Sequence, residues 1–164
     1  MEFREIFSKQ KQALRKRTNE IFELIRPEHL EFRPEKGALS LHEMLHHLWK
    51  SEEGVRRVAL DNDFAYYDKR IPKGLHSTLG ALLPLDQELS NLNRVHDETL
   101  AAVSKCPADL FEQDRAREDL NFRRKVWVIL MGINEHEVHH RAQIMTYLRM
   151  QGTFVPEPIR PRSA

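Results

Sequence analysis

The stretch that decides the fold is residues 126–152, VWVILMGINEHEVHHRAQIMTYLRMQG. Its apolar residues recur every three or four positions, which is the spacing of an α-helix with one face turned to a core. That face consists of Val126, Ile129, Leu130, Ile133, Ile144, Tyr147 and Leu148. We therefore expect a long helix from about Phe122 to Gln151, followed by Gly152 as a C-terminal cap.

Two histidines of this helix, His136 and His140, lie on one flank of the apolar face. They are four residues apart, which places their side chains about 5–6 Å from each other on the same side of a helix. Two imidazoles at this spacing can share one metal ion. His139 points away from the core, whereas Glu137 points directly inward and needs a partner if it is buried. Because two ligands make a poor metal site, a third must come from elsewhere in the chain.

A second predicted helix supplies candidates for the third ligand. Ser40 begins it, and Glu43 three residues later completes a capping-box pattern. His47 is the histidine nearest the inward face of this helix, and His46, directly beside it, is the rival candidate. His42 lies in the first turn, where we expect it to be solvated. The inward face consists of Leu41, Met44, Leu45, Leu48, Glu52, Val55 and Ala59.

Two more helices are predicted, one over about residues 2–25, ended by Pro27, and one from Pro84 to Pro107. The basic residues of the first are expected to form its solvated face: Lys9, Lys11, Arg15, Lys16 and Arg17. Long connections are expected at residues 26–39 and 61–78, a charged loop with a short helix around Leu110 at 108–121, and an extended tail at 153–164. With few glycines and no predicted strands, the chain reads as an all-α four-helix bundle, a single domain over residues 1–164.

Composition excludes several classes of protein. The chain has 164 residues, 26 Lys and Arg against 25 Asp and Glu, nine His and one Cys. A single cysteine, Cys106, excludes a disulfide framework and an all-cysteine zinc site, and it fits a reducing compartment. The balanced charge disfavours nucleic acid as a partner, although the tail segment Arg160-Pro161-Arg162 is basic. No apolar run is long enough for a membrane span, and the charged N-terminal segment is no signal peptide, so we expect a cytoplasmic protein.

Two segments match the zinc-protease pattern H-E-x-x-H, one beginning at His42 and one at His136. A protease is a poor fit for either match. In the first, Glu43 is better explained as a capping residue; in the second, no histidine follows His140 in the remaining 24 residues. We expect the three other histidines, His29, His76 and His96, to be structural or exposed.

Two segments carry a resemblance to a known family: residues 135–144, EHEVHHRAQI, with Tyr147-Leu148-Arg149 and Gly152 after them, and residues 40–48, SLHEMLHHL. Together they resemble the DinB-like family, whose last helix typically contains H-x-x-x-H-R-G-Q. Ala142 stands where that pattern has glycine. The resemblance covers the whole chain in element order. It implies a four-helix bundle that holds a divalent metal ion through His47, His136 and His140, the three histidines that the helix faces also favour.

The resemblance also implies a chemistry. Proteins similar to this family include transferases and isomerases that use low-molecular-weight thiols. We therefore expect a metal-dependent S-transferase that acts on a small electrophile, with Zn, Ni, Fe, Mn or Co as the ion and a thiol as possible cofactor. Glu137 would orient a ligand or act as a base. The alternatives are a hydrolase that uses a metal-bound hydroxide and a non-catalytic metal-binding stress-response protein.

The family is commonly dimeric, and the last helix carries a second apolar stripe. The stripe consists of Trp127, Met131, Val138 and Met145. A helix that is apolar on two sides packs on two sides. The second stripe therefore contacts either a second copy of the chain, giving a homodimer, or another helix of the same bundle.

Overall fold

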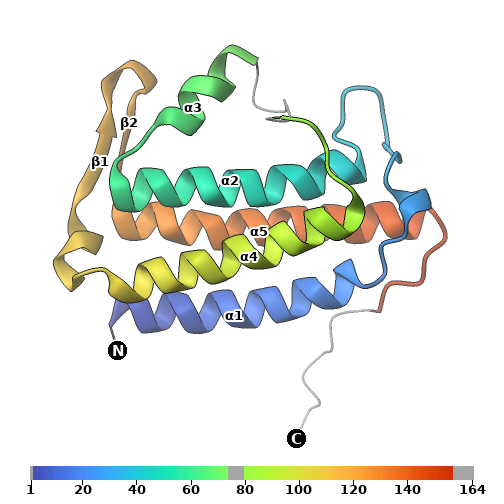
Figure 1. The fold of residues 1–164 in the computed structure, drawn as a ribbon, viewed down its shortest axis with the longest axis horizontal. Coiled ribbons are helices and arrows are strands. Elements are labelled where there is room, and N and C mark those ends of the chain that lie inside the picture. The colour runs from blue at the N-terminus through green and yellow to red at the C-terminus, as the bar shows by residue number, and fades with distance from the viewer. Residues whose placement is uncertain (1, 74–79, 157–164) are drawn as a thin grey trace, which may run out of the picture.

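The computed structural model describes residues 2–73 and 80–156. Within these ranges four long helices form a bundle (Figure 1): α1 (Phe3–Phe22), α2 (Leu41–Asp61), α4 (Leu85–Lys105) and α5 (Val126–Met150). Helices α2 and α1 each pack against both α4 and α5. The predicted four-helix bundle is confirmed. None of the described helices combines the length and apolar character needed to cross a membrane.

The directions of the helices explain why the connection between α2 and α4 is long. Helices α1 and α5 run one way along the bundle, and α2 and α4 run the other way (Figure 1). Because α2 and α4 are parallel neighbours, the chain between them must return along the length of the bundle. This return contains a short helix, α3 (Ala65–Arg70), and a 3-10 turn, η2 (Ile71–Lys73), which sequence analysis treated as connection. His76 and the rest of residues 74–79 lie outside the described residues.

A small β-hairpin precedes α5 and corrects two predictions. Strand β1 (Asp114–Arg117) pairs antiparallel with β2 (Phe122–Lys125), with Arg117 opposite Phe122. The expectation of no strands was therefore wrong, and α5 begins at Val126 rather than Phe122. Strands of four residues are too short for their alternation to be recognised in a sequence. The short helix expected around Leu110 is present as the 3-10 helix η3 (Ala108–Glu112), and a second one, η4 (Glu118–Leu120), lies in the hairpin turn.

The helix ends follow local sequence closely. Ser40 accepts a hydrogen bond from the Glu43 amide at 3.1 Å, and the Glu43 carboxylate accepts one from the Ser40 amide at 2.8 Å, as the capping box requires. Gly152 follows α5 with a φ of 80°, a left-handed conformation that glycine adopts without strain. Helix α1 ends at Phe22, three residues before the predicted end, and the 3-10 turn η1 (Pro27–His29) follows. The part of the predicted tail at residues 157–164, with Arg160-Pro161-Arg162, lies outside the described residues.

The core has two apolar clusters, one toward each end of the bundle. The first contains Ile21, Leu45, Trp49 and Ile144, and the second contains Phe7, Val58, Val103 and Ile133, each with further residues. Four charged residues lie between the clusters along their helices: Lys11, Arg15, Glu52 and Glu137. We call them the buried charge cluster, because each is at most 5% exposed.

The buried charge cluster overturns part of the prediction for α1. Lys11 and Arg15 were expected to be solvated, but they face the core while Lys9 is exposed. Lys11 Nζ lies 2.9 Å from a Glu52 carboxylate oxygen, and Arg15 donates to Glu137 at 2.9 Å. Burial by itself would raise the pKa of Glu137, but the charges of Arg15 and Lys11 outweigh it and lower the pKa. The carboxylates on α2 and α5 therefore make two buried cations on α1 tolerable.

Removing one member of the cluster tests this account. We expect Lys11→Met to lower the free energy of unfolding by about 3 kcal/mol, because the change leaves an excess buried negative charge on Glu52 and Glu137. The matched change Lys9→Met, at an exposed position of the same helix, is expected to alter it by less than about 0.5 kcal/mol. Urea unfolding of the three proteins measures both values. Equal midpoints for the two variants would contradict the account.

Candidate metal centre

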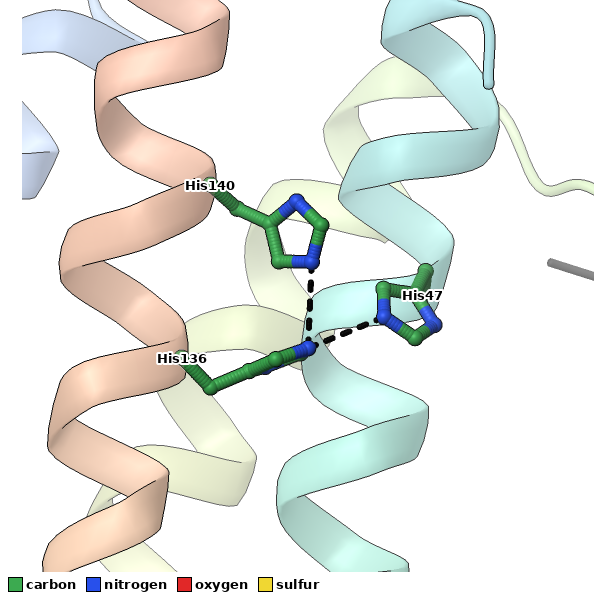
Figure 2. Close-up of side chains that lie close together, drawn as sticks. All are labelled: His47, His136 and His140. Carbon is green, nitrogen blue, oxygen red and sulfur yellow. Dashed lines mark hydrogen bonds between the residues drawn. The ribbon is translucent and has the colours of Figure 1, made fainter. Parts of the chain in front are cut away.

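Three histidines from two helices point their ring nitrogens at one place. His47 comes from α2, and His136 and His140 come from α5 (Figure 2). The Nε2 atom of His136 lies 2.9 Å from Nε2 of His47 and 3.0 Å from Nε2 of His140. All three ligand atoms lie within 4.8 Å of one another. The structure thus brings together the three residues that sequence analysis selected.

The geometry at His136 is unsuited to ordinary hydrogen bonds alone. An imidazole nitrogen offers either one lone pair or one N–H, in the plane of the ring. Nε2 of His136 faces two ring nitrogens, so it cannot form a normal hydrogen bond with both at once. A cation at the centre would satisfy three lone pairs together. Tetrahedral ligands at the usual Zn–N distance lie about 3.3 Å apart. The distances of 2.9 and 3.0 Å from His136 Nε2 to the other two ring nitrogens would therefore increase by a few tenths of an ångström to accommodate an ion.

In His140 and His47 the second ring nitrogen has a partner that orients the ring. His140 Nδ1 lies 2.7 Å from Gln143 Oε1, an acceptor, so the His140 proton sits on Nδ1 and leaves Nε2 with its lone pair. His47 Nδ1 lies 3.1 Å from Ser51 Oγ and 3.0 Å from a guanidinium nitrogen of Arg70. Gln143 belongs to the motif read from the sequence, but Arg70 does not.

Electrostatics keep His136 in the form that can bind a metal. Burial, with a smaller contribution from the neighbouring His140, His139 and Arg70, lowers its pKa from the usual 6.5 to about 3. The imidazole of His136 is therefore neutral at physiological pH. Neutral imidazole is the form that donates a lone pair to a metal ion.

A cavity of about 570 Å³ adjoins the three histidines. One part of its lining is polar and includes Ser51, Tyr66 and Arg70 beside His47. The rest is largely apolar, with Val55, Tyr67, Phe122, Val128, Ile129 and Ile133. A cavity of this volume and lining is typical of small-molecule sites.

The remaining histidines of α2 and α5 have other roles in the structure. His46, the rival of His47, is buried away from the cluster with Nδ1 2.9 Å from the Glu88 carboxylate, which also accepts from Trp49 at 2.6 Å. His42 was expected to be solvated; it is instead half-buried, with Nε2 2.7 Å from the Leu83 carbonyl oxygen, because the chain entering α4 covers it. His139 is exposed.

The two other described histidines, His29 and His96, were expected to be structural or exposed, and both are buried. His29 Nδ1 accepts from the Arg26 amide at 3.0 Å. Burial, together with the charges of Lys11 and Arg15, lowers the pKa of His96 to about 4.

Glu137 was proposed as a ligand-orienting group or base. Its carboxylate takes part in the buried charge cluster, and the carboxylates that line the cavity are those of Glu52 and Glu135. The need of Glu137 for a partner is met by Arg15. Its role in the chemistry of the site stays a prediction.

The contribution of α3 to the site was not predicted from the sequence. Tyr66 OH lies 2.8 Å from Ser51 Oγ and also bonds to Arg70, which is 5% exposed. One signal in the sequence was Gly54, a glycine in the interior of a predicted helix, which often marks a close approach by another segment. A Cβ atom added at Gly54 would lie 2.7 Å from Cβ of Tyr66 and closer still to its ring.

The second apolar stripe of α5 is divided between two environments. Trp127 and Val138 are each 39% exposed. Met131 and Met145 are partly buried and pack against the two core clusters. Half of the stripe therefore belongs to the bundle itself, and the other half faces outward.

Comparison with known proteins gives a family and a fold. The DinB superfamily matches residues 10–144. A DinB-like protein from Bacillus subtilis shares the fold with a TM-score of 0.72 at 17% identity, over 93% of this chain and 96% of that one. A DinB-like protein from Bacillus cereus gives 0.69 at 15% identity, over 96% and 95%.

A third similar structure is YfiT from Bacillus subtilis, described as a probable metal-dependent hydrolase with an unusual four-helix bundle topology. Its TM-score is 0.69 at 15% identity, over 92% of this chain and 89% of that one. Among curated proteins there is no match.

Two glycine substitutions test how α3 is seated. Alanine normally stabilises a helix relative to glycine, but Gly54→Ala would force Tyr66 off α2, so we expect a loss of about 1–3 kcal/mol in the free energy of unfolding. The matched control is Gly132→Ala in α5, where an added Cβ meets nothing within 4 Å. There we expect a gain of roughly 0.5–1 kcal/mol. Thermal or urea unfolding gives both signs, and a stabilised Gly54→Ala protein would refute the seating of Tyr66.

Proposed function

The chain belongs to the DinB superfamily, and on this premise we propose that it is a divalent-metal-dependent enzyme whose ion is held by His47, His136 and His140. The observation that carries the proposal is the meeting of three Nε2 atoms beside a cavity. Three protein ligands leave positions open on an ion, which is the pattern of catalytic rather than structural sites. An all-imidazole set accepts Zn, Ni, Fe, Mn or Co.

The reaction that we propose is transfer of a low-molecular-weight thiol to a small electrophile. A bound ion supplies charge that favours the thiolate over the thiol. The protein contributes oriented imidazoles, through Ser51 and Gln143, and a cavity large enough for a thiol and a small second substrate. Sulfur then attacks the electrophilic carbon, the leaving group departs with its bonding electrons, and the thiol proton passes to solvent.

Hydrolysis is the second candidate, because YfiT, of the same fold, is described as a probable metal-dependent hydrolase. In that case water replaces the thiol as nucleophile. A non-catalytic metal-binding protein is the third. The proposal includes a cytoplasmic location and a homodimer in which the exposed Trp127 and Val138 of α5 face a second copy.

Substrate assays separate the three candidates. Protein loaded with Zn or Ni is offered cysteine with 1-chloro-2,4-dinitrobenzene, and separately an ester such as p-nitrophenyl acetate. Thiol consumption that stops on chelation supports the transferase, and chelator-sensitive ester cleavage supports the hydrolase. Tight metal binding without turnover in either assay supports the non-catalytic candidate.

Alanine substitutions test the ligand set. We expect His47→Ala, His136→Ala and His140→Ala each to weaken metal affinity by at least about 100-fold, because two imidazoles remain. His139→Ala is the matched control, since it removes an exposed imidazole next to a proposed ligand and should leave affinity unchanged. Elemental analysis and competition with a chromogenic chelator give the values. If His139→Ala lost the metal while the other three variants kept it, the ligands would be wrongly assigned.

The affinity should also depend on pH. Protonated imidazole cannot bind a metal, so we expect affinity to fall as the pH drops through about 6. His136, with its pKa lowered to about 3, stays neutral over this range, so the fall reports on the other two proposed ligands. Competition titrations between pH 8 and 5 measure this fall. A flat profile across that range would contradict metal binding by His47 and His140.

A further inference from the structure

We propose that Gly132 is a specificity-determining residue, which seats a flat apolar group of the substrate, of the size of an aromatic ring, beside the metal centre. The inference rests on the proposed function and adds to it the class of the electrophile, a small molecule that carries an aromatic ring. Three features support it: the position of Gly132 on α5, the absence of a structural need for glycine there, and the way in which Gly54 seats the Tyr66 ring.

Gly132 lies at the centre of the wall that α5 contributes to the cavity. On a helix surface, the neighbours of a residue are those three and four positions away. For Gly132 these neighbours are Val128, Ile129, Glu135 and His136, and all four line the cavity together with it. Side chains of a helix lean toward its N-terminus, so the His136 ring extends toward the turn that contains Gly132. A group that lies on Gly132 is therefore next to the ring nitrogens of the proposed metal ligands.

The fold itself gives no reason for a glycine at this position. Among the described glycines, Gly37, Gly80 and Gly152 have positive φ angles, which favour glycine. Gly54 makes room for the α3 segment. Gly132 instead lies in the interior of α5, where alanine would favour the helix more. A Cβ atom added there would meet no atom of the described residues within 4 Å, so a side chain at this position would extend into the cavity.

The other glycine inside a described helix shows what such a position can hold. The absence of a side chain at Gly54 lets the Tyr66 ring lie directly on α2, where an added Cβ would be 2.2 Å from Tyr66 Cγ. Gly132 leaves the backbone of α5 uncovered in the same way, but there it faces the cavity. The adjoining wall is apolar, with Val128 and Ile129. A ring of the substrate thus fits Gly132 as the Tyr66 ring fits Gly54.

Two hydroxamates that differ only in one group test this seat. Acetohydroxamate carries a methyl group and benzohydroxamate a phenyl ring, and both bind zinc through their two oxygen atoms. Calorimetry measures the binding of each to zinc-loaded wild type, Gly132→Leu and the control Ala142→Leu, which adds a leucine side chain at an exposed position of α5 outside the cavity lining. We expect Gly132→Leu to weaken benzohydroxamate binding by about 10–100-fold, because leucine fills the seat. Acetohydroxamate binding should stay unchanged, and Ala142→Leu should bind both probes as the wild type does.

Gly132→Ala separates a role in substrate binding from a structural role, and it serves also if Gly132→Leu does not fold. We expect this variant to bind zinc and acetohydroxamate as the wild type does. Its added methyl group should weaken benzohydroxamate binding by about 3–5-fold, since the ring can no longer lie on the backbone. Loss of zinc from Gly132→Ala would mean that the glycine makes room for the His136 ring, and this would overturn the inference.

The remaining outcomes distinguish failure of the inference from failure of the proposed function. Unchanged benzohydroxamate affinity in Gly132→Leu, or equal weakening of both probes, would overturn the inference with the metal site intact. A zinc-loaded wild type that does not bind benzohydroxamate would overturn it as well. A wild-type protein that binds no zinc, nickel, iron, manganese or cobalt would refute the proposed function itself.

Discussion

The structure depends on the pairing of two buried cations of α1 with carboxylates from two other helices. Lys11 lies 2.9 Å from Glu52 of α2 and 3.8 Å from Glu137 of α5, and Arg15 donates to Glu137. A buried charge without its partner costs several kcal/mol, so α1, α2 and α5 cannot slide along one another without a large penalty. The interior of the bundle is thus held in one register by charge as well as by apolar packing.

That register also brings the proposed metal ligands together. Glu52 and His47 are little more than one turn apart on α2, and Glu137 is next to His136 on α5. When α1 brings the two carboxylates to the same level, His47 and His136 meet on the neighbouring side of the α2–α5 interface. Helix α5 therefore presents a paired carboxylate, Glu137, to the interior of the bundle and two imidazoles, His136 and His140, to the cavity.

The proposed centre has one part that lies on a single helix and another part that depends on a second segment of the chain. His136 and His140 lie on one helix, and the Gln143 amide of the same helix orients the His140 ring. His47 is instead surrounded by groups that arrive through the return segment between α2 and α4, where Tyr66 and Arg70 are seated on Gly54. The parallel arrangement of α2 and α4 makes this segment necessary (Figure 1), and its residues Tyr66 and Arg70 line the cavity. The topology of the bundle thus places Tyr66 and Arg70 beside His47.

The sequence by itself determined the helical class, the two capped helix ends and the histidines that could face a common site. These follow from periodicity and capping, which are local and act within a few residues. Only the tertiary structure decided that Lys11 and Arg15 are buried, since their partners lie 37–126 positions away in the chain. It also decided that His47 rather than His46 joins the cluster, that four-residue strands precede α5, and that Arg70 reaches His47. These outcomes depend on contacts between distant segments, whose energies no local pattern records.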